Sequence, residues 1–252
     1  MLLRISSYIV VFFFCVVITT AQEGYTFTQI NTDDGLASND VHALYLDEKG
    51  FIWVGSSNGL QRFDGTKFVN FFMPGKKGSD ALPISTLDYI VPGNNGILWL
   101  YFPELREVGI FDPAKFVYRK VAIKPNKPIA PRINARLWKD RMGSIYLSIQ
   151  PTGILKYDSS ENAFTSSAPF RAPENWSFGI KSAEDTRNGL MWLTFGDKGL
   201  AAYDYKTGET YTHQYNPKNI PLLKNWRVQE NIANIFIDKR GRYWLYNWPV
   251  WA

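Results

Sequence analysis

The sequence predicts an all-β fold, and three observations support this prediction. Three residue markers recur along the chain with one period, short apolar runs are joined by tight turn signals, and no run has the length and period of a helix. Each unit divides into four short strand-like runs. Because a period of about 46 residues with four strands is typical of a propeller blade, we expect a β-propeller of four-stranded antiparallel blades.

The markers are residue types that return at fixed places in each unit. The first is an aromatic residue in an apolar run after a glycine turn, at Trp53, Trp99, Tyr146, Trp192 and Trp244, in steps of 46, 47, 46 and 52 residues. The second is an aspartate after an aromatic residue, at Asp64, Asp112, Asp158 and Asp204. A third aromatic follows each of these, at Phe68, Phe116, Phe164 and Tyr211. Because large aromatics dominate packing between stacked sheets, we expect the first set to be buried.

The first unit shows how turn chemistry separates the strands. Residues 41–46 alternate apolar with small or polar side chains, and a turn at 47–50 leads into the next run. Asp47 can accept hydrogen bonds from the turn backbone, and Gly50 tolerates a positive φ. Asn58-Gly59 is a favoured hairpin signal. One carboxylate per turn is too few for calcium, so we expect these aspartates to cap turns and to bind no metal.

The units divide the chain into about four and a half blades. They are expected at 41–72, 86–121, 133–165, 178–215 and 232–252, the last of them truncated after its second strand. The segment 25–30 resembles the outer strand of a blade, which in closed rings completes the last blade. Its partner blade is missing from the sequence, so we expect an incomplete ring in the form of an open or imperfectly closed arc.

The N-terminus has the order of residues found in secretory signals. Arg4 precedes an apolar run at 9–18, and small residues follow up to Ala21, so we expect a signal peptide at 1–21 and a partial propeller at 22–252. A membrane anchor is the alternative, but the run is shorter than the roughly 20 residues that span a bilayer. Cys15, the one cysteine, lies inside this run. The mature chain is therefore expected to contain neither disulfides nor thiolate metal sites.

The charge pattern does not indicate nucleic-acid binding. The formal net charge is +5, and the basic residues are scattered along the chain. Nucleic-acid-binding proteins usually gather such residues on one face or in one arm. We therefore expect a solvated surface of mixed charge and no nucleic-acid partner.

One stretch resembles a known family. Residues 35–71, GLASNDVHALYLDEKGFIWVGSSNGLQRFDGTKFVNF, are similar to the two-component regulator propeller repeat, and the later units keep its aromatic, glycine and aspartate markers. The resemblance covers about residues 25–245. It implies the periplasmic sensor region of a hybrid two-component system of Bacteroidetes-type bacteria. Members of the family join two seven-bladed propellers and a β-sandwich to a membrane helix, a histidine kinase and regulator domains, and they sense oligosaccharides released from glycans.

The sequence contains nothing that resembles the kinase, its phosphoacceptor histidine or the membrane helix. We therefore expect an exported, periplasmic N-terminal fragment whose full-length form is anchored in the inner membrane and is a homodimer. It is expected to signal through its missing C-terminal parts and, by itself, to have no enzymatic activity. Ligand binding would shift the population of domain arrangements and would involve no chemical reaction.

Ligand-binding residues are expected in the long irregular connections, because binding residues gather on loops of a rigid scaffold. A carbohydrate-like ligand would stack on an exposed indole and receive hydrogen bonds from arginines. The candidates are Trp176, Trp226, Arg227, Arg106, Arg132 and Arg171. The alternatives are that the tryptophans cover the ends of blades and that the arginines are solvated.

Candidate catalytic residues are few. The histidines are His42 and His213, no Ser-His-Asp set is evident from their positions, and the carboxylate pairs lie in turns. We therefore expect no catalytic residues, cofactors or metal ions. Since a propeller fold also supports enzymes, two alternatives remain: a secreted lyase or hydrolase acting on glycans, and a protein-interaction propeller.

Overall fold

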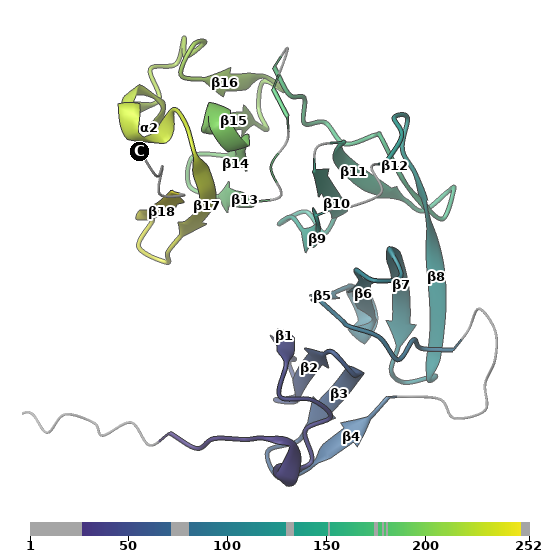
Figure 1. Cartoon of the computed structure of the whole chain (residues 1–252). Coiled ribbons are helices and arrows are strands. Elements are labelled where there is room, and N and C mark those ends of the chain that lie inside the picture. The colour runs from purple at the N-terminus through teal and green to yellow at the C-terminus, as the bar shows by residue number, and fades with distance from the viewer. Residues whose placement is uncertain are drawn as a thin grey trace, which may run out of the picture.

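The structure of the protein is a computed structural model that describes residues 27–71, 81–129, 134–150, 152–173, 176–177, 179 and 181–247. The predicted signal peptide at 1–21 and Arg132 lie outside these residues. The described part is built almost entirely of β-strands (Figure 1). Its one α-helix is α2 (Pro221–Lys224), and none of its helices is long and apolar enough to cross a membrane.

The strands form successive antiparallel units, as the repeat predicts. The first blade contains β1 (Val41–Leu46), β2 (Ile52–Ser56), β3 (Gly59–Phe63) and β4 (Phe68–Asn70). The second contains β5 (Tyr89–Pro92), β6 (Leu98–Phe102), β7 (Glu107–Asp112) and β8 (Val117–Lys124). The third contains β9 (Asn134–Lys139), β10 (Ile145–Gln150), β11 (Gly153–Asp158) and β12 (Ala163–Thr165). The fourth contains β13 (Ser182–Asp185), β14 (Leu190–Thr194), β15 (Leu200–Asp204) and β16 (Thr210–Thr212). The fifth contains β17 (Ile232–Ile237) and β18 (Tyr243–Asn247).

The blades follow one another around an open arc (Figure 1). The first strand of each blade lies on the inside of the arc, and the fourth strand lies on the outside. Each inner strand contacts the inner strand of a neighbouring blade, as β1 does with β5 and β13 with β17. The predicted all-β propeller with an incomplete ring is therefore confirmed.

One pairing departs from the expectation of separate four-stranded blades. Strand β8 pairs with β7 in its own blade and, through Ala122, Ile123 and Lys124, with β12 of the third blade in parallel. The second and third blades thus form one eight-stranded sheet. β8 has eight residues, whereas the other outer strands have three each, so its last residues extend past β7. This extension pairs an edge that would otherwise be open.

In the first, third and fifth blades, the turn after the inner strand also positions the marker aromatic. In the first blade, Asp47 Oδ1 accepts hydrogen bonds from the backbone N–H groups of Lys49 and Phe51, both at 2.9 Å, and Oδ2 accepts one from the Trp53 indole at 2.8 Å. In the third blade, the Tyr146 hydroxyl donates a hydrogen bond to Asp140 Oδ2 at 3.1 Å. In the fifth blade, the Trp244 indole donates one to Asp238 Oδ2 at the same distance. The turn-capping role predicted for Asp47 is confirmed.

The turn before each outer strand is capped in a similar way. Asp64 Oδ1 accepts a hydrogen bond from the backbone N–H of Thr66 at 2.9 Å, and Asp112 accepts one from Ala114 at 3.0 Å. Asp158 and Asp204 occupy the equivalent positions in the third and fourth blades and accept from residues two further along the chain. These carboxylates satisfy turn backbone groups and stabilise the entry into the outer strand.

The core lies between the blades. Trp53, Trp99, Tyr146 and Trp192 are buried. Trp244, which was expected to be buried with them, is 55% exposed, so that expectation is wrong for this chain. The reason is that Trp244 and its neighbour on the same face, Tyr246, lie on the far side of the fifth blade, where no other described blade covers them.

Candidate ligand-binding surface

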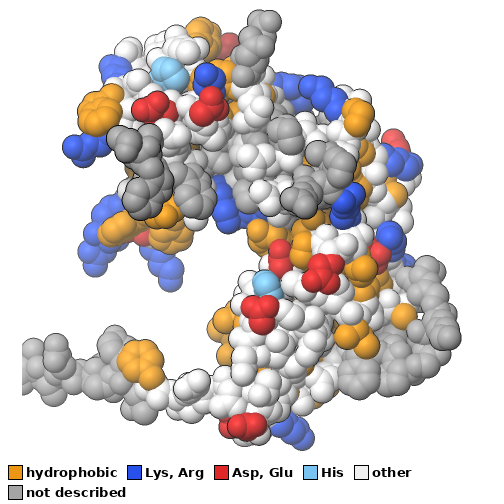
Figure 2. All heavy atoms as spheres, in the orientation of Figure 1, with side chains coloured by type: hydrophobic (Ala, Val, Ile, Leu, Met, Phe, Trp, Pro, Cys, Tyr) orange, Lys and Arg blue, Asp and Glu red, His pale blue; other side chains and the backbone are white. Residues whose placement is uncertain are grey.

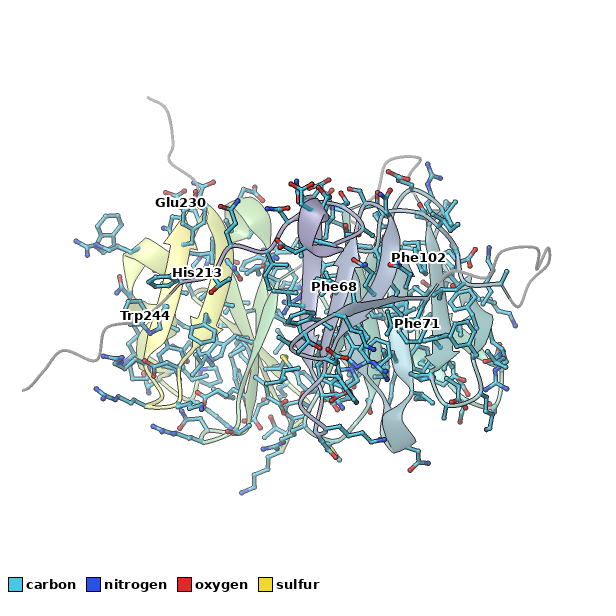
Figure 3. The ribbon with its side chains drawn as sticks, turned by 90° about the horizontal axis from the view of Figure 1, so that it is seen from below. Phe68, Phe71, Phe102, His213, Glu230 and Trp244 are labelled. Carbon is cyan, nitrogen blue, oxygen red and sulfur yellow. The ribbon has the colours of Figure 1, made fainter. Side chains whose placement is uncertain are left out.

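The irregular connections and the middle hairpins lie on the same face of the arc. Figure 3 shows the arc from the side, with Phe102 at the end of β6, His213 after β16 and Glu230 before β17 toward this face. We call it the connection face. The inner strands of the first four blades also begin here, so their first side chains gather along the inside of the arc.

Four charged or titratable residues mark the inner end of this face. Their positions in the repeat are the same or one residue apart, because His42, Asp88 and Lys181 each lie eleven residues before a marker tryptophan and Arg136 lies ten residues before Tyr146. We call the surface that they form the inner rim: His42, Asp88, Arg136 and Lys181. The sequence did not reveal the inner rim, because the repeat was aligned on the marker residues that the blades have in common.

The half of the inner rim that lies on the first two blades, with His42 and Asp88, is acidic; we call it the acidic half. His42 Nδ1 lies 3.2 Å from Asp88 Oδ1, and this contact joins the first two blades. Its Nε2 lies 3.1 Å from Asp40 Oδ2 and 3.3 Å from Ser57 Oγ. The Ser57 hydroxyl donates a hydrogen bond to Asp40. That bond is the main reason why the pKa of Asp40 is lowered.

A third carboxylate, that of Glu104, adds negative charge to the acidic half. Glu104, in the β6–β7 hairpin, accepts hydrogen bonds from the hydroxyls of Thr86 at 2.8 Å and Ser85 at 3.0 Å, and these bonds lower its pKa. Burial raises the pKa of Asp88, and the charges of Glu104 and Asp40 add to this effect while His42 opposes it. Acidic side chains accordingly gather around a histidine beside β1 and β5 (Figure 2).

Ser57, His42 and Asp88 lie in the order of a serine-hydrolase triad, which the sequence did not reveal. Two observations weaken that interpretation. The hydroxyl of Ser57 donates to Asp40, and the backbone N–H groups of Ser57 and Asn58 are already bonded, to Asp40 O at 3.1 Å and Ser56 Oγ at 3.2 Å. These two N–H groups are therefore not available to stabilise an oxyanion.

The second half of the inner rim is basic. Arg136 on β9 donates a hydrogen bond from Nη1 to the carbonyl of Ser182 at 3.2 Å, which joins the third and fourth blades. Burial lowers the pKa of Arg136. Lys181 immediately precedes Ser182, and its pKa is lowered by burial and then by the charge of Arg136. Within the described part of the chain, no carboxylate forms an ion pair with either cation.

A shallow pocket of about 270 Å³ opens on the first blade, and its lining residues Asn58 and Ile84 adjoin Ser57 and Ser85 of the acidic half in the chain. Its lining combines apolar and amide side chains from the first blade and the segment before β5: Ala37, Asn58, Gly59, Leu60, Asn70, Phe71, Pro83 and Ile84. The Asn58 side chain donates to Ala37 O at 2.6 Å and is thereby fixed in the wall. The volume is just below the ~300–1,000 Å³ of typical small-molecule pockets, so the pocket suits one small group of a larger ligand.

Two of the predicted ligand-binding residues serve local structure. Trp176 is half-buried, with its ring centroid 5.4 Å from Phe195 and 5.7 Å from His213, so it covers part of the core beside the fourth blade. Arg171 donates from Nη1 to the carbonyls of Ala168 and Phe170. The contacts of Trp176 correspond to the alternative in which the tryptophans cover the ends of blades, whereas Arg171 bonds to backbone carbonyls of its own connection.

The other predicted residues lie in separate connections. Trp226 is 71% exposed, and the Arg227 guanidinium lies 5.5 Å from its ring centroid. Arg106 lies in the β6–β7 hairpin with φ 51°, and its N–H bonds to Pro103 O at 3.1 Å. Among the described residues, no group of three or more histidine, cysteine or acidic side chains is arranged to hold a metal ion.

Comparison with known proteins supports the resemblance found in the sequence. The sequence model of the two component regulator propeller family matches residues 35–58, so the start of the first blade is a repeat of this kind, and the suspected relationship is confirmed there. No curated protein matches the chain.

Solved structures show the same fold. The chain is similar to the extracellular domain of BT4673 from B. thetaiotaomicron, described as a one component system, with a TM-score of 0.63, 18% identity, and coverage of 88% of this chain and 31% of that one. For the extracellular domain of the hybrid two component system BT3049 from the same organism, the TM-score is 0.63, with 16% identity and coverage of 89% and 30%. Virginiamycin B lyase from Staphylococcus aureus gives a TM-score of 0.51, with 16% identity and coverage of 88% and 66%. The chain therefore spans about three tenths of the length of the first two structures.

Proposed function

We propose that this chain is the exported, periplasmic ligand-sensing propeller of a two-component signalling system. The observation that carries the proposal is the two component regulator propeller repeat at residues 35–58. Its fold is also that of the extracellular domains of a one component system and of a hybrid two component system. The proposed sensor would act without chemistry on its ligand and would signal through membrane, kinase and regulator parts outside these 252 residues.

The proposed ligand is a glycan-derived oligosaccharide that binds along the inner rim. Support comes from the polar groups that converge there, since sugars are recognised by hydrogen bonds to their hydroxyls. His42, Ser57 and Glu104 offer such groups beside the shallow pocket. Residues from four consecutive blades contribute to this surface, so a ligand of several sugar units would contact more than one blade.

Signal transmission follows from the way in which the inner rim joins the blades. His42 contacts Asp88 across the first blade boundary, and Arg136 contacts Ser182 across the third. A ligand that binds across these boundaries favours the blade arrangements that fit it, which is a shift of population. In the proposed full-length homodimer, this shift would change how the two protomers pair.

Calorimetry of the full chain against a panel of neutral and acidic oligosaccharides tests the proposal. We expect saturable binding of at least one oligosaccharide, with the sugar recovered unchanged. H42A should weaken this binding, whereas K49A, a substitution in an exposed turn of the same blade, should leave it unchanged. Absence of binding across the panel would overturn the carbohydrate proposal and would favour the protein-interaction alternative.

A second candidate function is hydrolysis, which the positions of Ser57, His42 and Asp88 favour. The propeller fold is also found in virginiamycin B lyase, although such similarity concerns the fold alone. Incubation of the chain with the same panel, followed by mass spectrometry, separates the two functions. Product formation that S57A abolishes would establish the enzyme, and recovery of intact sugar after saturable binding would exclude it.

A further inference from the structure

The two halves of the inner rim carry opposite charge, which restricts the ligand that fits. We propose that this ligand carries an anionic oxygen group, a carboxylate or a sulfate, and that Arg136 and Lys181 bind it. The inference rests on the proposed oligosaccharide-sensing function and names the chemical class of the sugar.

The first argument is the geometry of Arg136. A guanidinium has five N–H donors in a planar fork, and one Nη1 bond to Ser182 O satisfies only part of this capacity. The bond also fixes the side chain across the boundary between the third and fourth blades. A fixed guanidinium can bind a carboxylate or a sulfate through two parallel N–H bonds, which are among the stronger hydrogen bonds in proteins.

The second argument is the placement of two cations side by side. Lys181 precedes the residue that Arg136 contacts, and both side chains are partly buried. Taking a charge out of water is costly unless an opposite charge compensates it. Over the ranges that the structure describes, the compensating group is not a carboxylate of the chain. A bound anion would supply it, and the lowered pKa of each cation is consistent with this need.

The third argument is orientation. An anionic group would be repelled by Asp40, Asp88 and Glu104 in the acidic half. The Tyr89 hydroxyl on β5 is within the influence of both halves: burial raises its pKa, the charge of Arg136 opposes this effect, and the charge of Asp88 adds to it. The acidic end of the sugar would therefore lie against the third and fourth blades, and its neutral hydroxyls would lie toward His42 and Ser57.

The test uses the full chain and matched sugars in calorimetry. The probes are trigalacturonate with its methyl ester, and a sulfated lactose with lactose as its desulfated form. The ester and the desulfated sugar remove the charge and keep the ring, and the two pairs distinguish a carboxylate from a sulfate. We expect a charged form to bind about tenfold or more tightly than its neutral form, because charge-assisted hydrogen bonds are stronger than neutral ones. Added salt should weaken binding of the charged form alone.

R136Q and K181Q provide the second measurement, with K239Q, at an exposed turn of the fifth blade, as the control. We expect R136Q to remove most of the preference for the charged form and K239Q to keep it. Equal binding of charged and neutral sugars would overturn this inference and leave the proposed sensor intact, whereas no binding of any sugar would overturn both. Because the comparison of sugars needs no variant, it remains decisive even if R136Q fails to fold.

Discussion

The fourth and fifth blades place the same repeat marker in opposite environments. Trp192 on β14 is 0% exposed, whereas Trp244 on β18 is 55% exposed. Trp192 packs edge-on against Tyr243 of the fifth blade at 5.7 Å between ring centroids, so its cover comes from the next blade. Trp244 has no such cover among the described residues. A marker therefore fixes where a residue lies in its blade, and the next blade decides whether it is buried.

The turn aspartates of these two blades differ in the same way. Asp185 Oδ1 accepts hydrogen bonds from the N–H groups of Arg187 and Asn188, both at 3.2 Å, and its Oδ2 accepts one from the Tyr243 hydroxyl across the blade boundary. Asp238 makes its hydrogen bonds within the fifth blade, to residues such as Arg240 and Arg242. The turn of the fourth blade thus also serves as a contact with the fifth blade.

The largest expected effect is the loss of Trp192. We expect Trp192→Ala to lower the free energy of unfolding by about 3–5 kcal/mol, because it leaves a cavity where two blades meet. The matched Trp244→Ala should cost clearly less, since half of that side chain remains in water in the folded state. Urea unfolding followed by circular dichroism measures both. Equal losses of unfolding free energy in the two variants would show that Trp244 is buried in solution and would contradict the difference between the two blades.

The turn aspartates give the next effect. Asp185→Ala should cost about 1–3 kcal/mol, because it leaves turn N–H groups and the Tyr243 hydroxyl without their acceptor. Tyr243→Phe removes the hydroxyl that donates to Asp185 and accepts from Asn188 Nδ2 at 3.4 Å, so the double variant should lose less free energy of unfolding than the sum of the single losses. Asp238→Ala, measured in the same urea series, should have the smaller effect of the two aspartate substitutions. A larger loss for Asp238→Ala would contradict the importance of the cross-blade contact.

The sequence was sufficient to predict the scaffold because the scaffold rests on local chemistry that repeats. Asp47, Gly50 and the Asn58-Gly59 hairpin signal define turns in any context, and the period then places each strand in its blade. It could not predict the extension of β8 onto β12, since parallel pairing between two blades depends on strand length and position in space. The exposure of Trp244 was missed for the related reason that burial is a property of two blades.

The candidate site was harder to predict because it lies where the repeats differ. His42, Asp88, Arg136 and Lys181 lie within one residue of the same place in the repeat but differ in residue type, so an alignment of common markers passes over them. The exposed indole of Trp226 and the arginines were chosen instead for their chemistry. Comparing residues at one repeat position, rather than residues that fit sugar binding, would have found the inner rim.

The stability of the fold is expected to decrease moderately as the pH is lowered. Hydrogen bonds, chiefly from the Lys67 backbone and Thr66, lower the pKa of Asp64 to about 2, and turn hydrogen bonds also lower that of Asp238. A carboxyl with a lowered folded-state pKa stabilises the fold above its unfolded pKa of about 3.8 and loses this effect as the pH falls. The urea midpoint should therefore fall between about pH 4 and pH 2. Asp238→Asn should flatten this fall, and an unchanged slope would show that the fifth-blade turn is open in solution.

The smallest expected effect belongs to Trp226, in the connection between the fourth and fifth blades. Because its indole is 71% exposed, Trp226→Ala should change the free energy of unfolding by no more than about 0.5 kcal/mol. Trp176→Ala should cost more, since Trp176 packs on Phe195 and His213. If Trp226→Ala instead weakened sugar binding while stability stayed unchanged, the ligand would extend from the inner rim to this connection. If both stability and binding stayed unchanged, the inner rim alone would carry recognition, and the difference between the two blades would concern packing rather than function.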